Sequence, residues 1–156
     1  MKRAGLKLAL VALAVSTIGC DRITKHLAEG MLAGAPVHSY LADTLRLEYA
    51  ENPGAFLSLG ATWPAWARQG LLAGGTGVLL VAIAVAAIRR RWGGQALVGA
   101  CLLWTGGVSN VLDRAARGFV VDFLNVGVGP VRTGIFNVAD VAVMLGVALV
   151  VTARRK

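Results

Sequence analysis

Two aspartates of this chain lie in apolar surroundings that do not suit a charge. Asp122 stands within "VVDF" and Asp140 within "NVADVAV", and neither has a lysine or arginine beside it in the sequence. Two carboxyl groups brought together at low dielectric cannot both ionise easily, so one of them keeps its proton. Such a pair offers one base and one acid, which can activate water against an amide carbonyl without a metal or a covalent nucleophile. The alternative is two unrelated polar residues, each satisfied by the backbone.

Further polar residues recur in short groups near the ends of apolar runs. The groups are Asp21 with Lys25, Asn52 with Gly54, Asn110 with Asp113 and Arg114, and Asn137 with Asp140. Spacings of three or four residues place two side chains on the same face of a continuing helix. For Asp113 and Arg114 we expect a salt bridge that ties a helix end, in preference to a role in chemistry. For Asp21 and Lys25, a solvated helix end and a role in holding lipid both remain open.

The composition indicates which elements position these residues. Of the 156 residues 56% are hydrophobic and 15% are charged, and the mean hydropathy is +0.67, which is too apolar for one small soluble core. Four runs approach the ~20 residues that cross a bilayer as helix, namely 4–20, 70–88, 96–112 and 135–153. The sequence therefore predicts an α-helical integral membrane protein with four transmembrane helices in a single membrane domain, residues 1–156.

The net charge of +8 is concentrated in three basic clusters. These are Lys2, Arg3 and Lys7; Arg89, Arg90 and Arg91; and Arg154, Arg155 and Lys156. With four spans all three fall on one side of the membrane, which the positive-inside rule makes the cytoplasm. Both termini are then cytoplasmic, and residues 21–69 and 113–134 are extracytoplasmic. Basic residues on a folded face with aromatics among them are absent, so we expect no nucleic-acid partner.

The two outer segments have the pattern of strands. Leu45, Leu47 and Tyr49 alternate with polar residues, and "GFVVDFLNVGVGPVRTG" is strand-like with a turn at Gly129-Pro130. "NPGAF" has the chemistry of a turn, and two tryptophans at 63 and 66 suit the membrane interface. We expect a small extracytoplasmic β element and a short interfacial helix. The start of the chain resembles a lipoprotein signal that ends at Cys20, but the charge pattern requires this first helix to be retained.

Four blocks together resemble the signature of signal peptidase II, the lipoprotein signal peptidase of bacteria. They are "DRITK", "ENPGAF", "SNVLDRAARGFVVDF" and "FNVAD", and they cover nearly the whole chain in the right order. The resemblance implies an aspartic endopeptidase with Asp122 and Asp140 as its catalytic residues. It assigns substrate binding or support of the pair to Asp21, Lys25, Asn52, Gly54, Asn110, Asp113, Arg114 and Asn137. Ser109 departs from the family, which usually has glycine there.

The resemblance also implies a substrate and a location. The substrate is a prolipoprotein whose cysteine carries diacylglycerol, cut just before that cysteine, and the enzyme lies in the bacterial cytoplasmic membrane with its site near the outer face. Membrane lipid is the other partner, and we expect a monomer. No cluster of ligands with metal spacing is present, so we expect neither metal nor cofactor. A small proton-coupled transporter and a non-enzymatic membrane adaptor are the alternatives, although no internal repeat of the transporter kind is visible.

Overall fold

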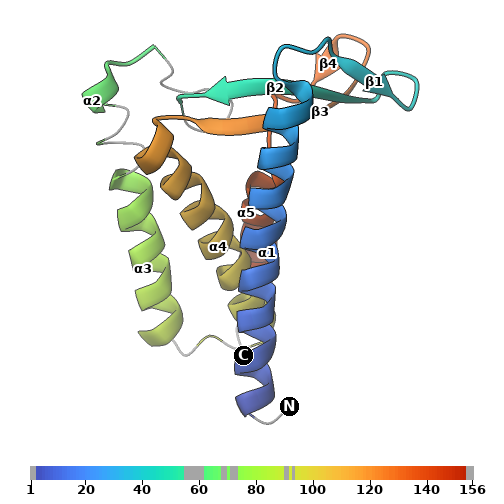
Figure 1. Ribbon diagram of the computed structural model, residues 1–156. Helices are drawn as coiled ribbons and strands as arrows, with labels where there is room; N and C mark the ends of the chain where they lie inside the picture. The colour runs from blue at the N-terminus through green and yellow to red at the C-terminus, as the bar shows by residue number, and fades with distance from the viewer. Residues whose placement is uncertain are drawn as a thin grey trace.

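The computed structural model describes residues 3–54, 62–67, 70, 74–89, 92 and 94–153. Long helices stand side by side, and a small sheet lies across one end of them (Figure 1). The elements in chain order are α1 (Arg3–Leu32), β1 (His38–Tyr40), β2 (Leu45–Asn52), α2 (Ala65–Ala67), α3 (Gly75–Arg89), α4 (Gly94–Arg117), β3 (Val120–Val128), β4 (Val131–Arg132) and α5 (Val138–Thr152). The combination of helices with a small β element agrees with the sequence prediction.

Among the described residues two helices are long and apolar enough to cross a membrane, α1 from Ala4 and α4. The helices α3 and α5 have 15 residues each, which at 1.5 Å per residue span ~22 Å of a ~30 Å hydrocarbon core. The number of four spans therefore stays a prediction. The helix α1 continues past position 20, where the apolar run was predicted to end, as far as Leu32. Its charged residues Asp21, Arg22 and Lys25, beyond position 20, have partners on other elements, as described below.

The helix α4 is central, because α1, α3 and α5 all pack against it. Glycines bring α4 and α5 unusually close. A Cβ added at Gly146 would lie 2.5 Å from the backbone nitrogen of Leu103, and one added at Gly106 would overlap the carbonyl oxygen of Ala139. Since real Cβ atoms do not approach so closely, only glycine fits at these two positions. The α4–α5 pair is thereby fixed at the level of the functional residues.

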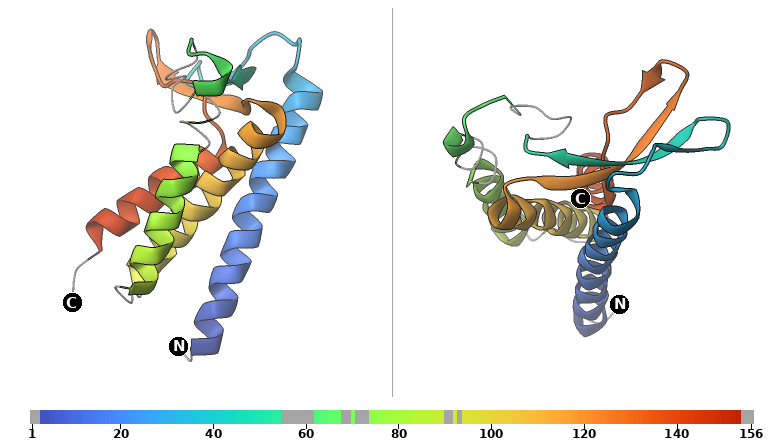
Figure 2. Two further views of the ribbon diagram at one scale, coloured as in Figure 1. Left: turned by 90° about the vertical axis from the view of Figure 1, so that its left-hand side faces the viewer. Right: turned by 45° about the horizontal axis from the view of Figure 1, so that its top comes forward.

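The sheet is antiparallel with strand order β1-β2-β3-β4, and its strands run across the ends of the helices (Figures 1 and 2). The central pair runs in register from Asn52 opposite Val120 to Leu45 opposite Val126, with an irregularity between Leu47 and Ala50. Gly129, at φ +56°, allows the tight turn between β3 and β4 that the sequence predicted at Gly129-Pro130. On the α1 side of the sheet, Val121 and Phe123 pack with Ala28 in a small core.

Candidate active site

Asp122 lies on β3, and amide groups surround its carboxylate. Its side chain is 2% exposed. Asn52 donates from Nδ2 to Oδ2 at 2.9 Å, and Asn137 donates from Nδ2 to Oδ1 at 2.6 Å. The main chain fixes both amides, because the N–H of Gly54 donates to Asn52 Oδ1 at 3.0 Å and the N–H of Asp140 donates to Asn137 Oδ1 at 2.9 Å. Both asparagines can therefore present only their NH₂ group to Asp122.

Asp140 lies in the first turn of α5, whose N-cap is Asn137. The two form a capping box, in which Asp140 Oδ2 also accepts the backbone N–H of Asn137 at 3.3 Å. The other oxygen, Oδ1, accepts from Nδ2 of Asn110 at 2.9 Å. The spacing of three residues between Asn137 and Asp140 was predicted to place them on one helix face if the helix continued there. It instead reflects a cap, and Asn137 lies just outside the helix with its side chain between the two aspartates.

Lys25 determines which way the Asn110 amide points. Lys25 is buried, with 4% of the residue exposed, and its ammonium group donates to Oδ1 of Asn110 at 2.9 Å. An ammonium group has no acceptor, so it can meet only the carbonyl oxygen of the amide. The NH₂ group of Asn110 is consequently directed at Asp140. All three asparagines thus turn donors toward the two carboxylates.

Lys25 also belongs to a buried cluster of charges. Its Nζ lies 2.7 Å from Oδ2 of Asp21 and 2.7 Å from Oδ2 of Asp113. Arg22 pairs with the other oxygen of Asp113. Asp21 is fully buried and accepts from the Ser109 hydroxyl at 2.6 Å and from the backbone N–H of Ala139 at 2.9 Å. This cluster links α1 to α4 and to the start of α5.

The structure excludes one open alternative and contradicts one prediction about these charges. Of the two readings left open for Asp21 and Lys25, the solvated helix end is excluded, because both residues are buried and paired across helices. Asp113 does not form a salt bridge with Arg114 but pairs with Lys25 and Arg22. Neighbours in sequence point to different sides of a helix, so a partner on another element can reach only one of the two.

Arg114 holds the chain where β2 ends. Its Nε and Nη2 both donate to the carbonyl oxygen of Gly54, the former at 3.1 Å. Its Nη1 lies 3.4 Å from the carbonyl oxygen of Asn110, one turn earlier in α4. Both side chains line the same cavity, in agreement with the shared helix face that their i,i+4 spacing predicted. The guanidinium group thereby connects α4 to the turn that fixes the Asn52 amide. The remaining residues of "NPGAF", at positions 55 and 56, lie outside the described residues.

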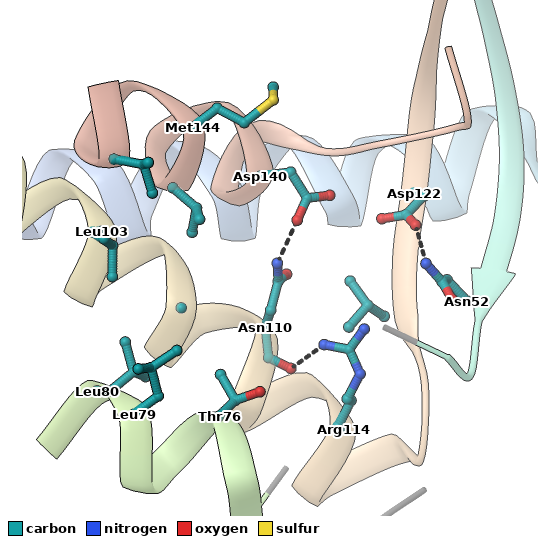
Figure 3. A pocket seen from close by; sticks show the side chains of 14 residues that line it. Asn52, Thr76, Leu79, Leu80, Leu103, Asn110, Arg114, Asp122, Asp140 and Met144 are labelled. Carbon is teal, nitrogen blue, oxygen red and sulfur yellow. Dashed lines mark hydrogen bonds between the residues drawn. The ribbon is translucent and has the colours of Figure 1, made fainter. Parts of the chain in front are cut away.

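A cavity of about 450 Å³ opens beside the two aspartates (Figure 3). Its polar end contains Asp122 and Asp140 with Asn52, Asn110 and Arg114. The rest of its wall is almost wholly apolar and comes from β3, at Val120, and mainly from α3, α4 and α5, including Leu79, Leu80, Leu103, Val143, Met144 and Val147. The site therefore combines two carboxyl groups and fixed amide donors with an apolar slot that runs along the helices.

The electrostatic environment favours a retained proton. Burial raises the pKa of the Asp122 carboxyl to about 6, and the negative charge of Asp140 acts in the same direction. The hydrogen bonds from Asn52 and Asn137 and the charge of Lys25 oppose this rise. The pair can therefore keep one proton up to about pH 6, well above the ordinary range of a carboxyl group. This proton belongs to the coupled pair rather than to one residue.

The structure brings every residue of the predicted site into one connected network. The sequence reasoning missed Arg22 and did not foresee the hydrogen bond of Ser109. A signal for Ser109 exists, because a hydroxyl inside an apolar helix, directly before Asn110, must find an acceptor. No signal in the sequence joins Arg22 to Asp113, since the two are 91 residues apart.

Comparisons with solved structures show which fold the chain has. Two structures described as bacterial membrane enzymes, determined by the in meso method at 2.3 and 1.9 Å, share the fold with TM-scores of 0.78 and 0.77. Each is 23% identical and covers 92% of this chain, and this chain covers 85% and 90% of theirs. The chain thus shares the fold of these two membrane proteins.

Sequence comparisons identify the family. Residues 13–154 match the family described as signal peptidase (SPase) II. The lipoprotein signal peptidase of Sphingopyxis alaskensis is 34% identical over 94% of this chain and 84% of its own, and that of Teredinibacter turnerae is 34% identical over 95% and 86%. The chain belongs to the signal peptidase II family and is a protease. The family that the four sequence blocks predicted is confirmed.

Proposed function

We propose that the protein is an aspartic endopeptidase that removes signal peptides from prolipoproteins, with Asp122 and Asp140 as its catalytic residues. The observation that carries this proposal is the position of both carboxyl groups on one cavity, with Asn137 between them and hydrogen-bonded to each. The relatives' name, lipoprotein signal peptidase, supplies the substrate class. No observation favours the transporter alternative.

The proposed chemistry needs one proton on the pair. The ionised aspartate takes a proton from water as the water oxygen attacks the scissile carbonyl carbon. The protonated aspartate donates its proton to the carbonyl oxygen, which gives a neutral tetrahedral intermediate. When the C–N bond breaks, the pair gives its proton to the leaving nitrogen and takes the proton of one hydroxyl of the intermediate, which becomes the new carboxyl group. The pair then again holds one proton. We do not assign these roles to one aspartate or the other, because the pair titrates jointly.

The surrounding groups would favour this cycle by holding the pair in place. Each carboxylate oxygen of the pair accepts one hydrogen bond from Asn52, Asn110 or Asn137, while a second lone pair of each oxygen remains for water or substrate. Donors that are already oriented cost no reorganisation during the reaction. Arg114, at the cavity wall, would hold the peptide backbone of the substrate.

The apolar slot suits a substrate that comes from the bilayer. A signal helix and the diacylglyceryl group on the cysteine would lie against the apolar walls of α3 and α5, and the bond before the cysteine would reach the pair. This arrangement requires the predicted topology, with both termini in the cytoplasm, four spans, and the sheet on the outer side of the cytoplasmic membrane. The proposal treats a single chain as sufficient, because all the site residues come from one chain.

Cleavage of a defined substrate tests the proposal. The purified protein in lipid vesicles should release the signal peptide from a diacylated prolipoprotein, detected as a mass shift, with the new N-terminus at the lipidated cysteine. The same prolipoprotein without diacylglycerol is the control and should be cut far more slowly. Cleavage at another bond, or no cleavage by folded protein, would contradict the proposed function.

A further inference from the structure

The sheet has two chemically different faces at the end that carries its turns. The turns between β1 and β2 and between β3 and β4 project at the same end, away from α3 (Figures 1 and 2). Residues that are partners across an antiparallel ladder point to the same face, and residues two apart on one strand do so as well. The register therefore assigns each side chain of this end to one face or the other.

One face is apolar and exposed. Tyr40 stands opposite Leu45 and Leu45 opposite Val126, while Val128 stands opposite Val131. Tyr40 is 49% exposed, Val126 37%, Val128 75% and Val131 79%. We name Tyr40, Val126, Val128 and Val131 the tip face. Side chains this apolar are seldom grouped on a surface that meets only water.

The opposite face is polar and its groups satisfy one another. Arg46 stands opposite Ser39 and Asn125, and all three point away from the tip face. Arg46 and Ser39 donate to Asp43 at 2.6–2.7 Å, and their hydrogen bonds hold the pKa of that carboxyl well below its usual range. Arg132 reaches Asn125 and the Asp43 carbonyl oxygen. The sheet end is therefore amphipathic.

The direction of the tip face follows from β3 itself. Val120 and Asp122 line the cavity against the helices, and Val126 and Val128 are on the same side of this strand by alternation. The tip face therefore lies on the same side of the sheet as α3, α4 and α5, and opposite the side on which Val121 and Phe123 pack with Ala28 of α1. The apolar face of this sheet end is thus turned toward those three helices, and its polar face is turned away from them.

From this geometry we infer that the tip face lies in the membrane leaflet on the sheet's side, and that it anchors the outer end of β3 in lipid. The occupant is the bilayer that surrounds the helices, not a second protein. Burial of four apolar side chains favours this placement, and the polar face stays in water with its charges paired. Asp122 is on the anchored strand, so the anchor also fixes the depth of the active site relative to the bilayer. This statement about the active site rests on the proposed function, whereas the anchor itself does not.

A fluorescent label placed on either face tests the inference without relying on catalysis. In a protein in which Cys20 and Cys101 are replaced by alanine, Val131→Cys carries an NBD label on the tip face and Ser39→Cys carries it on the polar face. In vesicles of phosphatidylethanolamine and phosphatidylglycerol, doxyl-labelled lipid should quench the label at 131 at least about twofold more than the label at 39, because NBD in lipid meets the quencher directly. Equal quenching at the two sites would overturn the inference.

Two companion variants make the result specific. Val128→Asp, on the tip face beside 131, should remove most of the quenching at 131, and Val128→Leu should keep it, because only the first introduces a charge into lipid. Val128 is 75% exposed, so neither substitution at this position disturbs the core. A different outcome would show that the tip face is a contact between copies of the chain. In that case the label at 131 is not quenched by doxyl-labelled lipid, and in detergent it becomes shielded from water as the protein concentration rises. The inference would then be wrong.

Discussion

Replacing either aspartate of the pair by asparagine is the most direct perturbation of the site. The change keeps size and polarity but removes the group that exchanges a proton, so turnover should fall ~10²-fold or more, which is about 2.7 kcal/mol of lost transition-state stabilisation. If Asp122 and Asp140 acted independently, the double variant would lose ~10⁴-fold. Since they are proposed to act as one unit, the double variant should be little worse than either single variant.

The structure also predicts what Asp122→Asn costs in stability. Asp122 receives donors on both oxygens, from Asn52 and Asn137, and the main chain fixes both of those amides. The new amide has a single oxygen, so one of the two donors would face its NH₂ group. A buried donor left without an acceptor costs about 1–3 kcal/mol. We therefore expect a folded but less stable protein.

The assay is cleavage of a diacylated prolipoprotein by wild type, each single variant and the double variant, at matched amounts of protein in the membrane. Asp43→Asn is the matched control, because Asp43 is also at the sheet end of the molecule but is not among the residues that line the cavity. Turnover near that of wild type in either single variant would refute the aspartic mechanism. A double variant ~10²-fold worse than each single variant would refute the joint action of the pair.

Three further predictions concern the charges and the topology. Because the pKa of Asp122 is raised to about 6, kcat/KM should fall as pH rises through and above about 6, where the pair loses its last proton; a pH profile without this alkaline limb would contradict the shared proton. Lys25→Met removes a cation that lowers the pKa of Asp122, so the alkaline limb should move to higher pH. Lys25→Met should also lower the free energy of unfolding by about 3–5 kcal/mol, because it leaves Asp21 and Asp113 buried without their cation, and the double variant Lys25→Met/Asp113→Asn should recover part of this loss. Denaturation of the single and the double variant in detergent measures both effects. Equal stability of these two variants would argue against the buried charge cluster. Reporter fusions at position 91 and at Tyr49 should give opposite sides of the membrane, and the same side for both would rule out the four-span topology.

The sequence predicts local features of this protein well, because they depend on neighbours along the chain. Alternating side chains predicted β2, and the turn residues Gly129 and Pro130 predicted the hairpin between β3 and β4. Asp122 and Asp140 stand in apolar sequence without a neighbouring lysine or arginine, and this predicted that the two share a site. A carboxylate in apolar surroundings needs polar partners, and few polar residues are near these two in the sequence.

Long-range partners could not be predicted in the same way. Lys25 contacts Asn110 across 85 residues, and nothing near either residue specifies that pairing. The sequence predicted an apolar run that ends at position 20 and left open whether the helix continues beyond it; α1 continues to Leu32, and the partners of its charged residues there lie on α4 and α5. The predicted bond between Asp113 and Arg114 considered only adjacent residues and so missed Lys25 and Arg22.

The close approach of α4 and α5 has a consequence for how this sequence can vary in evolution. Gly106 lies one helical turn before Asn110, and its neighbour across the interface, Ala139, directly precedes Asp140. The spacing that lets Asn110 reach Asp140 at 2.9 Å is thus set by the absence of a single methyl group. We expect the smallest possible substitution, glycine to alanine, to be among the most damaging here, and exchanges among the exposed apolar residues of α1 to be well tolerated. We therefore expect mutational tolerance in this protein to follow distance from the α4–α5 contact more closely than it follows side-chain size.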